Sequence, residues 1–169
     1  LFELSVLAVR LPSAILSTLS VIAVYFLFKE LFINSNFKLE IRNLKLDIPI
    51  IVTLLIVISP WHIYISRLGH EVNASYAFFI FGLLFFFRFL RKEKRSLYLS
   101  AIFFALSFDS YQSTKIVVPL ALLVLVVLYS KELIANKRTV IISAIIGFVI
   151  ALPILVTSFD QSALIRFKG

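Results

Sequence analysis

The stretch SPWHIYISRLGHEVN, residues 59–73, joins two segments that consist almost entirely of Ile, Leu, Val and Phe. It contains a Trp, two His, an Arg and a Glu. Ionisable groups near a bilayer are costly unless they are solvated or paired, so they mark functional sites more often there than elsewhere. This stretch therefore separates two apolar segments and supplies the first candidates for a functional site.

The composition around this stretch is that of a membrane protein. Of the 169 residues 61% are hydrophobic, whereas soluble domains are roughly 45–50% apolar. So large an excess does not fit in one globular core, which excludes a soluble helical protein. The apolar runs approach the roughly 20 residues that cross a bilayer. We predict an all-α, polytopic transmembrane helix bundle with about six spans, Leu11–Phe32, Ile48–Ile65, Val72–Leu90, Leu97–Ser110, Thr114–Tyr129 and Val140–Ser158.

The sequence contains neither Cys nor Met, and position 1 is Leu. Without Cys, disulfides and thiol chemistry are excluded. A primary translation product normally begins with Met, and the features of a signal peptide are missing at position 1. We therefore interpret residues 1–169 as an internal piece of a longer protein and as part of one transmembrane domain.

The net charge of +8 lies mainly in short loops, and nothing resembles a module that reads bases or tracks phosphates. We therefore expect a bilayer and no nucleic acid as partner. Twelve of the cations fall on one side of the predicted spans: Lys29, Lys38, Arg42, Lys45, Arg88, Arg91, Lys92, Lys94, Arg95, Lys131, Lys137 and Arg138. The other five are Arg10, Arg67, Lys115, Arg166 and Lys168. By the positive-inside rule the first side is cytoplasmic in a multi-pass protein of the plasma membrane. We expect residues 37–49 to lie along that cytoplasmic interface.

The turns on the outer side carry the candidate site. They place Arg67, His70 and Glu71 near Asp109, Tyr111 and Lys115, because consecutive helices usually pack as neighbours. We predict that the two turns line one cavity open to the outer face. Two predicted helices also begin there, and a helix N-terminus beside a cation binds anions. The natural anion at a membrane surface is a lipid phosphate, so the cluster predicts a polyprenyl phosphate site. An alternative is that Arg67 and Glu71 pair only to close the turn.

Other chemistries have weaker support. His70–Glu71 lacks the second His of an H-E-x-x-H motif, so we expect no cofactor and assign no metal ligands, although a divalent metal stays open. The sequon Asn73-Ala-Ser75 lies at a predicted helix start near the membrane, and we treat it as chance. Trp61 and Tyr64 fit an interfacial aromatic belt.

Three segments together resemble a known family: VRLPSAILSTLSVIAVYFLFKELF (9–32), LIVISPWHIYISRLGHEVNASYAFFIFGLLFFF (55–87) and LSFDSYQSTKIVVPLALL (106–123). Their order and spacing resemble the membrane-embedded GT-C glycosyltransferases, the bacterial and archaeal relatives of protein O-mannosyltransferase and aminoarabinose transferase. The resemblance covers about residues 8–129. Positions that match the family's SPWHxxxSR segment are Ser59, Pro60, Trp61, His62, Ser66 and Arg67. Lys115 stands where many relatives have a basic or polar residue.

The resemblance implies transfer of a sugar from a polyprenyl-phosphate donor to a lipid, glycan or protein acceptor at the outer face. It places the catalytic Asp, or Asp-Glu pair, in an outer loop upstream of residue 1, so no catalytic residue is assigned here. Arg67, Lys115 and the helix N-termini would stabilise charge on the leaving phosphate. Glu71 or Asp109 would position sugar or acceptor, or would hold the two cations in place.

Two other classes of protein remain as alternatives. A non-enzymatic transporter or flippase for a lipid-linked anion would place broken helices and ionisable groups near mid-membrane. The predicted ionisable cluster lies at one face, which favours the enzyme. A structural membrane subunit would leave the outer cluster unexplained.

Overall fold

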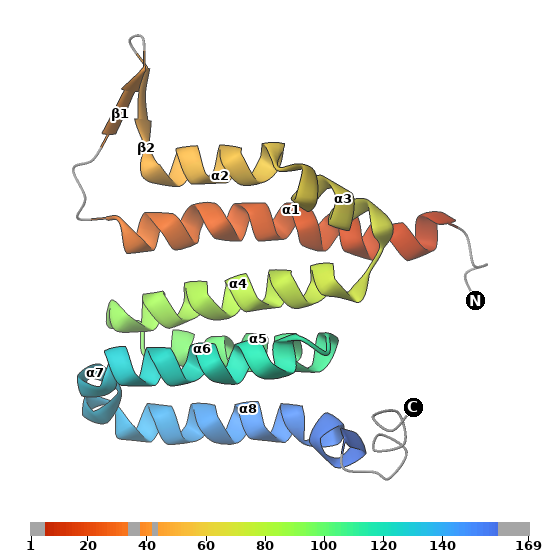
Figure 1. The fold of residues 1–169 in the computed structure, drawn as a ribbon. Coiled ribbons are helices and arrows are strands. Elements are labelled where there is room, and N and C mark those ends of the chain that lie inside the picture. The colour runs from red at the N-terminus through yellow and green to blue at the C-terminus, as the bar shows by residue number, and fades with distance from the viewer. Residues whose placement is uncertain (1–5, 34–37, 42–43, 159–169) are drawn as a thin grey trace.

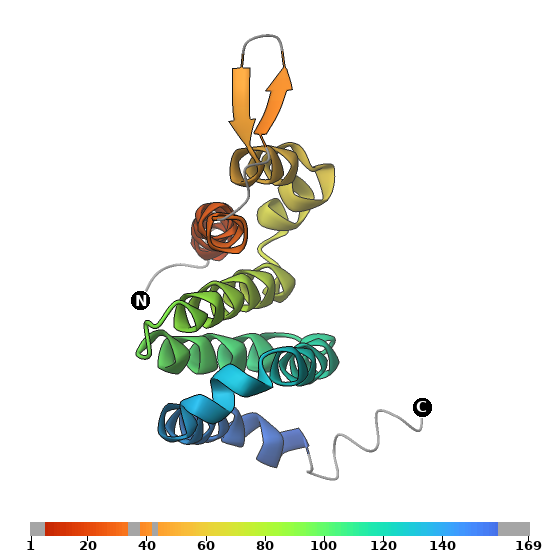
Figure 2. The same cartoon turned by 90° about the vertical axis from the view of Figure 1, so that its left-hand side faces the viewer.

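The computed structural model describes residues 6–33, 38–41 and 44–158. Within them the chain forms a stack of antiparallel helices and one small hairpin (Figures 1 and 2). The elements are α1 Val6–Leu31, β1 Lys38–Ile41, β2 Leu44–Asp47, α2 Ile48–Ile58, α3 Pro60–Leu68, α4 Glu71–Leu90, α5 Ser96–Ser110, α6 Thr114–Leu128, α7 Ser130–Ala135 and α8 Lys137–Ser158. The predicted all-α bundle is confirmed, and the hairpin is a small addition to it.

The second expected span is the one that differs most from its prediction. Ile48–Ile65 is not one helix: α2 and α3 are bent by 57° relative to each other at Ser59. The cause is Pro60, the first residue of α3. Proline lacks an amide donor and disfavours helical backbone at the residue before it, and Ser59 accordingly has φ −59° and ψ 120°.

The expected number of spans is roughly compatible with these helices, but not every helix is long enough to cross alone. Among the described residues, Arg10–Leu31 and Glu71–Leu90 have the length and composition of membrane spans, and the bent α2–α3 pair makes a third if it counts as one span. α5 and α6 are apolar but have 15 residues each. The chain is therefore an integral membrane protein with helices of unequal length.

The segment 37–49 contains the hairpin, which projects from the start of α2 (Figure 1). The antiparallel register places Lys38 opposite Asp47 and Glu40 opposite Lys45. The sequence did not predict strands here, because each has only four residues. Of the residues used in the predictions, Phe37, Arg42, Arg166 and Lys168 lie outside the described residues.

The turns gather at two ends of the bundle (Figure 1). We call the end with the turns at 67–71 and 110–114 the Arg67 end. The opposite end, with the turn at 91–95 and with α7, is the Arg91 end. Successive long helices run in alternate directions: α1, α2, α4, α5, α6 and α8. The described loops therefore lie at the two ends in the same two groups that the sequence predicted for the two sides of the membrane. Which end faces the cytoplasm stays a prediction.

Small residues let α4 pack closely on α5. Ser100 Oγ donates to the Gly82 carbonyl at 2.8 Å, and a Cβ on Gly82 would lie 2.9 Å from the Phe104 ring. Helix interfaces in membranes favour small residues because lipid supplies no hydrophobic driving force between helices. α4 thus lies centrally, with α1 on one side and α5 on the other (Figure 2).

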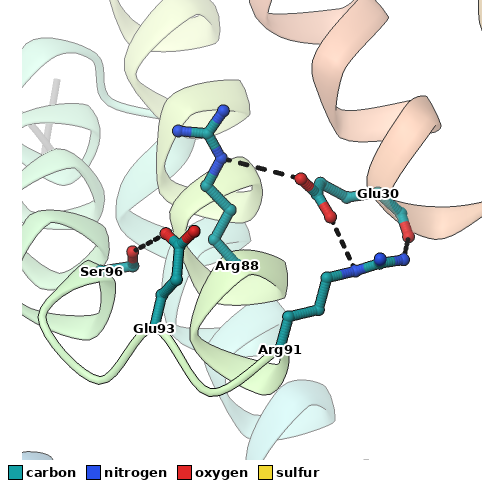
Figure 3. A network of polar contacts seen from close by, with 5 residues as sticks. All are labelled: Glu30, Arg88, Arg91, Glu93 and Ser96. Carbon is teal, nitrogen blue, oxygen red and sulfur yellow. Dashed lines mark hydrogen bonds and ion pairs between the residues drawn. The ribbon is translucent and has the colours of Figure 1, made fainter. Parts of the chain in front are cut away.

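An ionic cluster joins α1 to α4 at the Arg91 end (Figure 3). Arg91 Nε lies 2.7 Å from Glu30 Oε2, and Arg88 Nε lies 3.9 Å from Glu30 Oε1. Arg91 also donates to the Glu30 backbone carbonyl, which places a cation at the C-terminus of α1, where the helix dipole favours it. These two arginines therefore hold helices together in addition to any effect on topology.

Candidate functional site

The bend at Ser59 directs α3 across the Arg67 end of the bundle. The Ser59 amide donates to the Ile56 carbonyl at 3.1 Å and closes α2, while the Ser59 carbonyl accepts from the Ile63 amide at 3.1 Å and opens α3. α3 ends at Gly69, whose φ of 66° and ψ of 27° lie in the left-handed region. Glycine adopts this conformation without the cost of a Cβ. Pro60 and Gly69 thus fix where the helix with Arg67 begins and ends.

Arg67 shares a cavity of about 400 Å³ with Arg10, Ala14 and Ser66. Arg10 and Ala14 are four residues apart on α1 and share one of its faces, whereas Ser66 and Arg67 come from the end of α3. Its lining residues include two arginines, both exposed, and no acid. Like charges at one cavity repel unless an anion lies between them, so this arrangement favours an anionic ligand.

Arg10 was missed as a site residue by the sequence reasoning. It was assigned to the same side as Arg67, but candidates came only from the turns between predicted spans. The available signal was its position directly before the first predicted span, on the side poor in cations. Because cations are rare on that side, each of them is a candidate for the same site.

Hydrogen bonds hold α3 and the start of α4 against α1 beside this cavity. Ser13 Oγ donates to the Ser66 carbonyl at 3.1 Å, and Ser17 Oγ lies 3.0 Å from His62 Nε2. Asn73 Nδ2 donates to the Ser13 carbonyl at 2.7 Å and lies 2.9 Å from Ser13 Oγ. These contacts position Arg67 relative to Arg10, and none of them was predicted.

Asn73 is only 1% exposed. Its amide is already bonded to Ser13, so the Asn73-Ala-Ser75 sequon has a structural role at this helix junction. This agrees with the interpretation that the sequon is chance.

The two predicted outer turns meet through His70 and Tyr111. Their rings lie 6.1 Å apart at 76° to each other, an edge-to-face arrangement of the kind that aromatic pairs prefer. His70 also precedes α4, where its Nδ1 accepts a long hydrogen bond of 3.4 Å from the Val72 amide. The turns are therefore neighbours, although the cavity at Arg67 is not lined by residues of the 109–115 turn.

Close to this contact, the hydroxyl groups of Ser75, Ser107 and Thr114 join α4, α5 and α6. Ser75 Oγ lies 3.1 Å from the Ser107 carbonyl, and Ser107 Oγ donates to the Ser75 carbonyl at 2.9 Å. Thr114 Oγ1 lies 2.8 Å from the Ser107 carbonyl and 2.6 Å from the Tyr111 carbonyl. Because Thr114 is the first residue of α6, the cluster fixes the helix start that carries Lys115.

Asp109 and Lys115 lie near each other at the same turn. Lys115 attracts the Asp109 carboxylate electrostatically, and both residues are half-buried. Asp109 Oδ1 is buried and accepts no hydrogen bond among the described residues. This carboxylate oxygen is thus available to a donor that approaches from a ligand or from the rest of the protein.

Glu71 lies in the first turn of α4, where an acid stabilises the helix N-terminus. In the part of the chain that the structure describes, no ion pair joins Arg67 to Glu71. The structure thus gives no support to the alternative that this pair closes the turn, at which Gly69 adopts the left-handed conformation. Among the same residues, no group of three or more His, Cys, Asp or Glu could hold a metal ion.

A second cavity of about 240 Å³ lies between the bent α2–α3 pair and α4. Ser59, Trp61, His62, Asn73 and Tyr76 supply its polar or aromatic walls. Trp61 is 71% exposed, and its ring lies 6.5 Å from that of Tyr64. Both rings are exposed on α3, and their place in an aromatic belt stays a prediction.

The fold and the site together define a helical membrane protein with a cationic cavity at one end of its bundle. The sequence profile of the dolichyl-phosphate-mannose-protein mannosyltransferase family matches residues 1–156, and the chain belongs to that family of membrane glycosyltransferases. No curated protein matches the chain, and no solved structure does. The predicted resemblance is thereby confirmed at the level of the family.

Proposed function

We propose that this chain is part of an enzyme that transfers a sugar from a polyprenyl-phosphate donor to a lipid, glycan or protein acceptor. In this proposal the Arg67 end faces outward from the plasma membrane, and the cavity between Arg10 and Arg67 binds the donor phosphate. The observation that carries the proposal is this cavity, because two arginines from different helices line it without an acid. Membership in a mannosyltransferase family supplies the reaction class.

The chemistry suits these groups. In the transfer, the bond between the sugar carbon and the phosphate oxygen breaks while an acceptor hydroxyl attacks that carbon. Negative charge develops on the departing lipid phosphate, and cations placed beside it stabilise that charge. Arg10 and Arg67 offer planar guanidinium groups, each of which can donate two parallel hydrogen bonds to a phosphate.

The second group of candidates has a different role in this proposal. His70, Asp109, Tyr111 and Lys115 gather around the turn that precedes α6. They would line the path of the sugar or the acceptor. The Asp109 carboxylate would accept a hydrogen bond from a hydroxyl group, and Lys115 would add positive potential. Glu71, exposed beside them, would contact the acceptor. The base that deprotonates the acceptor hydroxyl is not assigned among the described residues.

A transporter or flippase for a lipid-linked anion is the second candidate, because one observation favours it. The helix pair α2–α3 is broken at Ser59, and transporters often bind their substrates at broken helices. Sugar transfer in detergent distinguishes the two candidates. An enzyme still transfers sugar there, whereas a transporter has no separate compartments to move its substrate between and forms no product.

The test is sugar transfer from a polyprenyl-phosphate donor by the full-length protein in detergent. Arg67→Ala and Arg10→Ala should each lower kcat by about 100- to 1,000-fold, as loss of one stabilising donor does in other enzymes. Arg67→Lys should recover only part of the rate, because a point charge does not reproduce the planar fork. His62→Ala should have a smaller effect, since His62 contacts Ser17 and acts through packing.

Lys92→Ala is the matched control, because it removes an exposed cation at the opposite end. Its rate should equal that of the unmodified protein. Near-normal transfer by folded, membrane-inserted Arg67→Ala would refute the phosphate site. Absence of transfer by the unmodified full-length protein, combined with movement of the lipid-linked anion across liposomes, would favour the transporter.

A further inference from the structure

An apolar groove of about 440 Å³ lies between α5, α6 and α8, away from the cavity at Arg67. Leu97, Leu133 and Val140 line it near the Arg91 end, and Phe108, Val118 and Ala151 line it farther along the bundle. From Leu97 to Phe108 the helix α5 rises by about 16 Å. The groove is therefore elongated along the helices, as a hydrocarbon chain is.

Cations surround the Arg91 end of this groove. The segments 91–95 and 131–138 contain seven Lys or Arg and two acids, all of them exposed. Arg91 is paired with Glu30 on α1, which leaves six of the cations for the groove. One of the acids, Glu93, accepts a hydrogen bond from Ser96, and the other is Glu132 on α7. Figure 2 shows α7 crossing between α6 and α8 at this end.

The register of α8 connects charge and groove directly. Val140, Ala144, Gly147 and Ala151 line the groove at spacings of three and four residues, which is one face of a helix. Lys137 lies three residues before Val140 and extends the same face toward the end of the bundle. On α5, Lys94 and Arg95 directly precede the groove residue Leu97.

We infer that the groove binds one acyl chain of an anionic phospholipid, whose phosphate lies against Lys137, Arg138 and the cations that precede α5. The apolar wall accepts the chain, and the cationic end selects for net negative charge on the headgroup. A zwitterionic phospholipid has the same chains but no net charge, so the cations separate the two classes. This inference is independent of the proposed function, since the donor phosphate is assigned to the other end.

The experiment uses purified full-length protein in detergent with an equimolar mixture of phosphatidylglycerol and phosphatidylcholine that have identical acyl chains. Native mass spectrometry counts the bound lipids. We expect phosphatidylglycerol to be retained preferentially. The double variant Lys137→Gln, Arg138→Gln should lower its affinity about 25-fold, at about fivefold for each cation near a membrane surface.

Two matched pairs of variants separate a defined site from general effects. Lys29→Gln removes an exposed cation of α1 and should leave retention unchanged. Ala144→Phe fills the groove and should abolish retention, whereas Ile145→Phe adds the same ring at an exposed neighbour that does not line the groove and should not.

Three results would overturn the inference. One is equal retention of the two lipids by the unmodified protein. Another is an unchanged lipid count in Ala144→Phe. The third is displacement of the lipid by a polyprenyl phosphate whose affinity depends on Lys115 rather than on Lys137, because the groove would then hold the donor's chain.

Discussion

At the scale of single residues, the sequence identified Arg67 but not its partner. Arg67 was conspicuous because it is a cation in an otherwise apolar region. Arg10 lies near it only because α3 packs on α1 through Ser13 and Ser66, which are 53 residues apart in the chain. Serine hydroxyls give no sequence signal for such a contact, so the pair follows from tertiary packing and not from local pattern.

The buried Asn73 leads to a residue-scale prediction about stability. Asn73→Ala removes the amide that donates to the Ser13 carbonyl and leaves that polar group without this donor. Hydrogen bonds between membrane helices contribute about 0.6 to 2 kcal/mol, so we expect the free energy of unfolding to fall by about 1 kcal/mol. Unfolding of the full-length protein in a denaturing detergent mixture measures this loss.

The control is Asn136→Ala. Its amide donates to the Glu132 carbonyl in an exposed turn, where water can replace the bond. That variant should lose less stability than Asn73→Ala. Equal losses in the two variants would mean that burial of the Ser13–Asn73 contact adds nothing.

At the scale of elements, the sequence predicted helix positions well and their interruptions poorly. The expected span Val72–Leu90 corresponds to α4 Glu71–Leu90, because a long apolar run between charged turns has few alternatives in a membrane. The break at Ser59 was missed although Pro60 was noted in the motif. Apolar residues continue from α2 into α3, so the length of the apolar run predicts one span. The prediction did not take into account that Pro60 disfavours helical backbone at Ser59.

Close packing of α4 on α5 gives a prediction for the element scale. In Gly82→Ala the new Cβ would lie 2.9 Å from the buried ring of Phe104, so the ring or a helix must move. Overpacking of this kind typically costs about 1–3 kcal/mol. We therefore expect Gly82→Ala to lower the unfolding temperature of the full-length protein in detergent.

Gly147→Ala is the matched control in α8. There the added Cβ would meet Ala101 at 3.6 Å, an ordinary contact, and alanine favours a helix over glycine by up to about 1 kcal/mol. This variant should be neutral or slightly stabilising. If both substitutions lowered stability equally, the cause would be general to glycine in these helices and not the contact with Phe104.

At the scale of the whole molecule, α4 connects two different polar assemblies. At one end His70 contacts Tyr111 in the turn before α6, and Asn73 donates a hydrogen bond to Ser13 of α1. At the other end Arg88 and Arg91 bind Glu30 on α1 (Figure 3). α1 and α4 are thus fastened at both ends, which fixes their relative axial position. The cavity with Arg10 and Arg67 therefore has a rigid frame on its α1 side.

The orientation of this frame in the membrane is the prediction for the whole molecule. Cations concentrate at the Arg91 end, and cytoplasmic loops carry an excess of Lys and Arg. The sequence contains no Cys, so a cysteine introduced into it is a distinct target.

In intact cells that produce the full-length protein, a membrane-impermeant maleimide should label Gln112→Cys, at the exposed turn of the Arg67 end. Lys94→Cys, exposed at the opposite end, should react only after the membrane is permeabilised. Labelling of Lys94→Cys in intact cells, with Gln112→Cys protected, would invert the orientation and move the proposed sugar transfer to the cytoplasmic face.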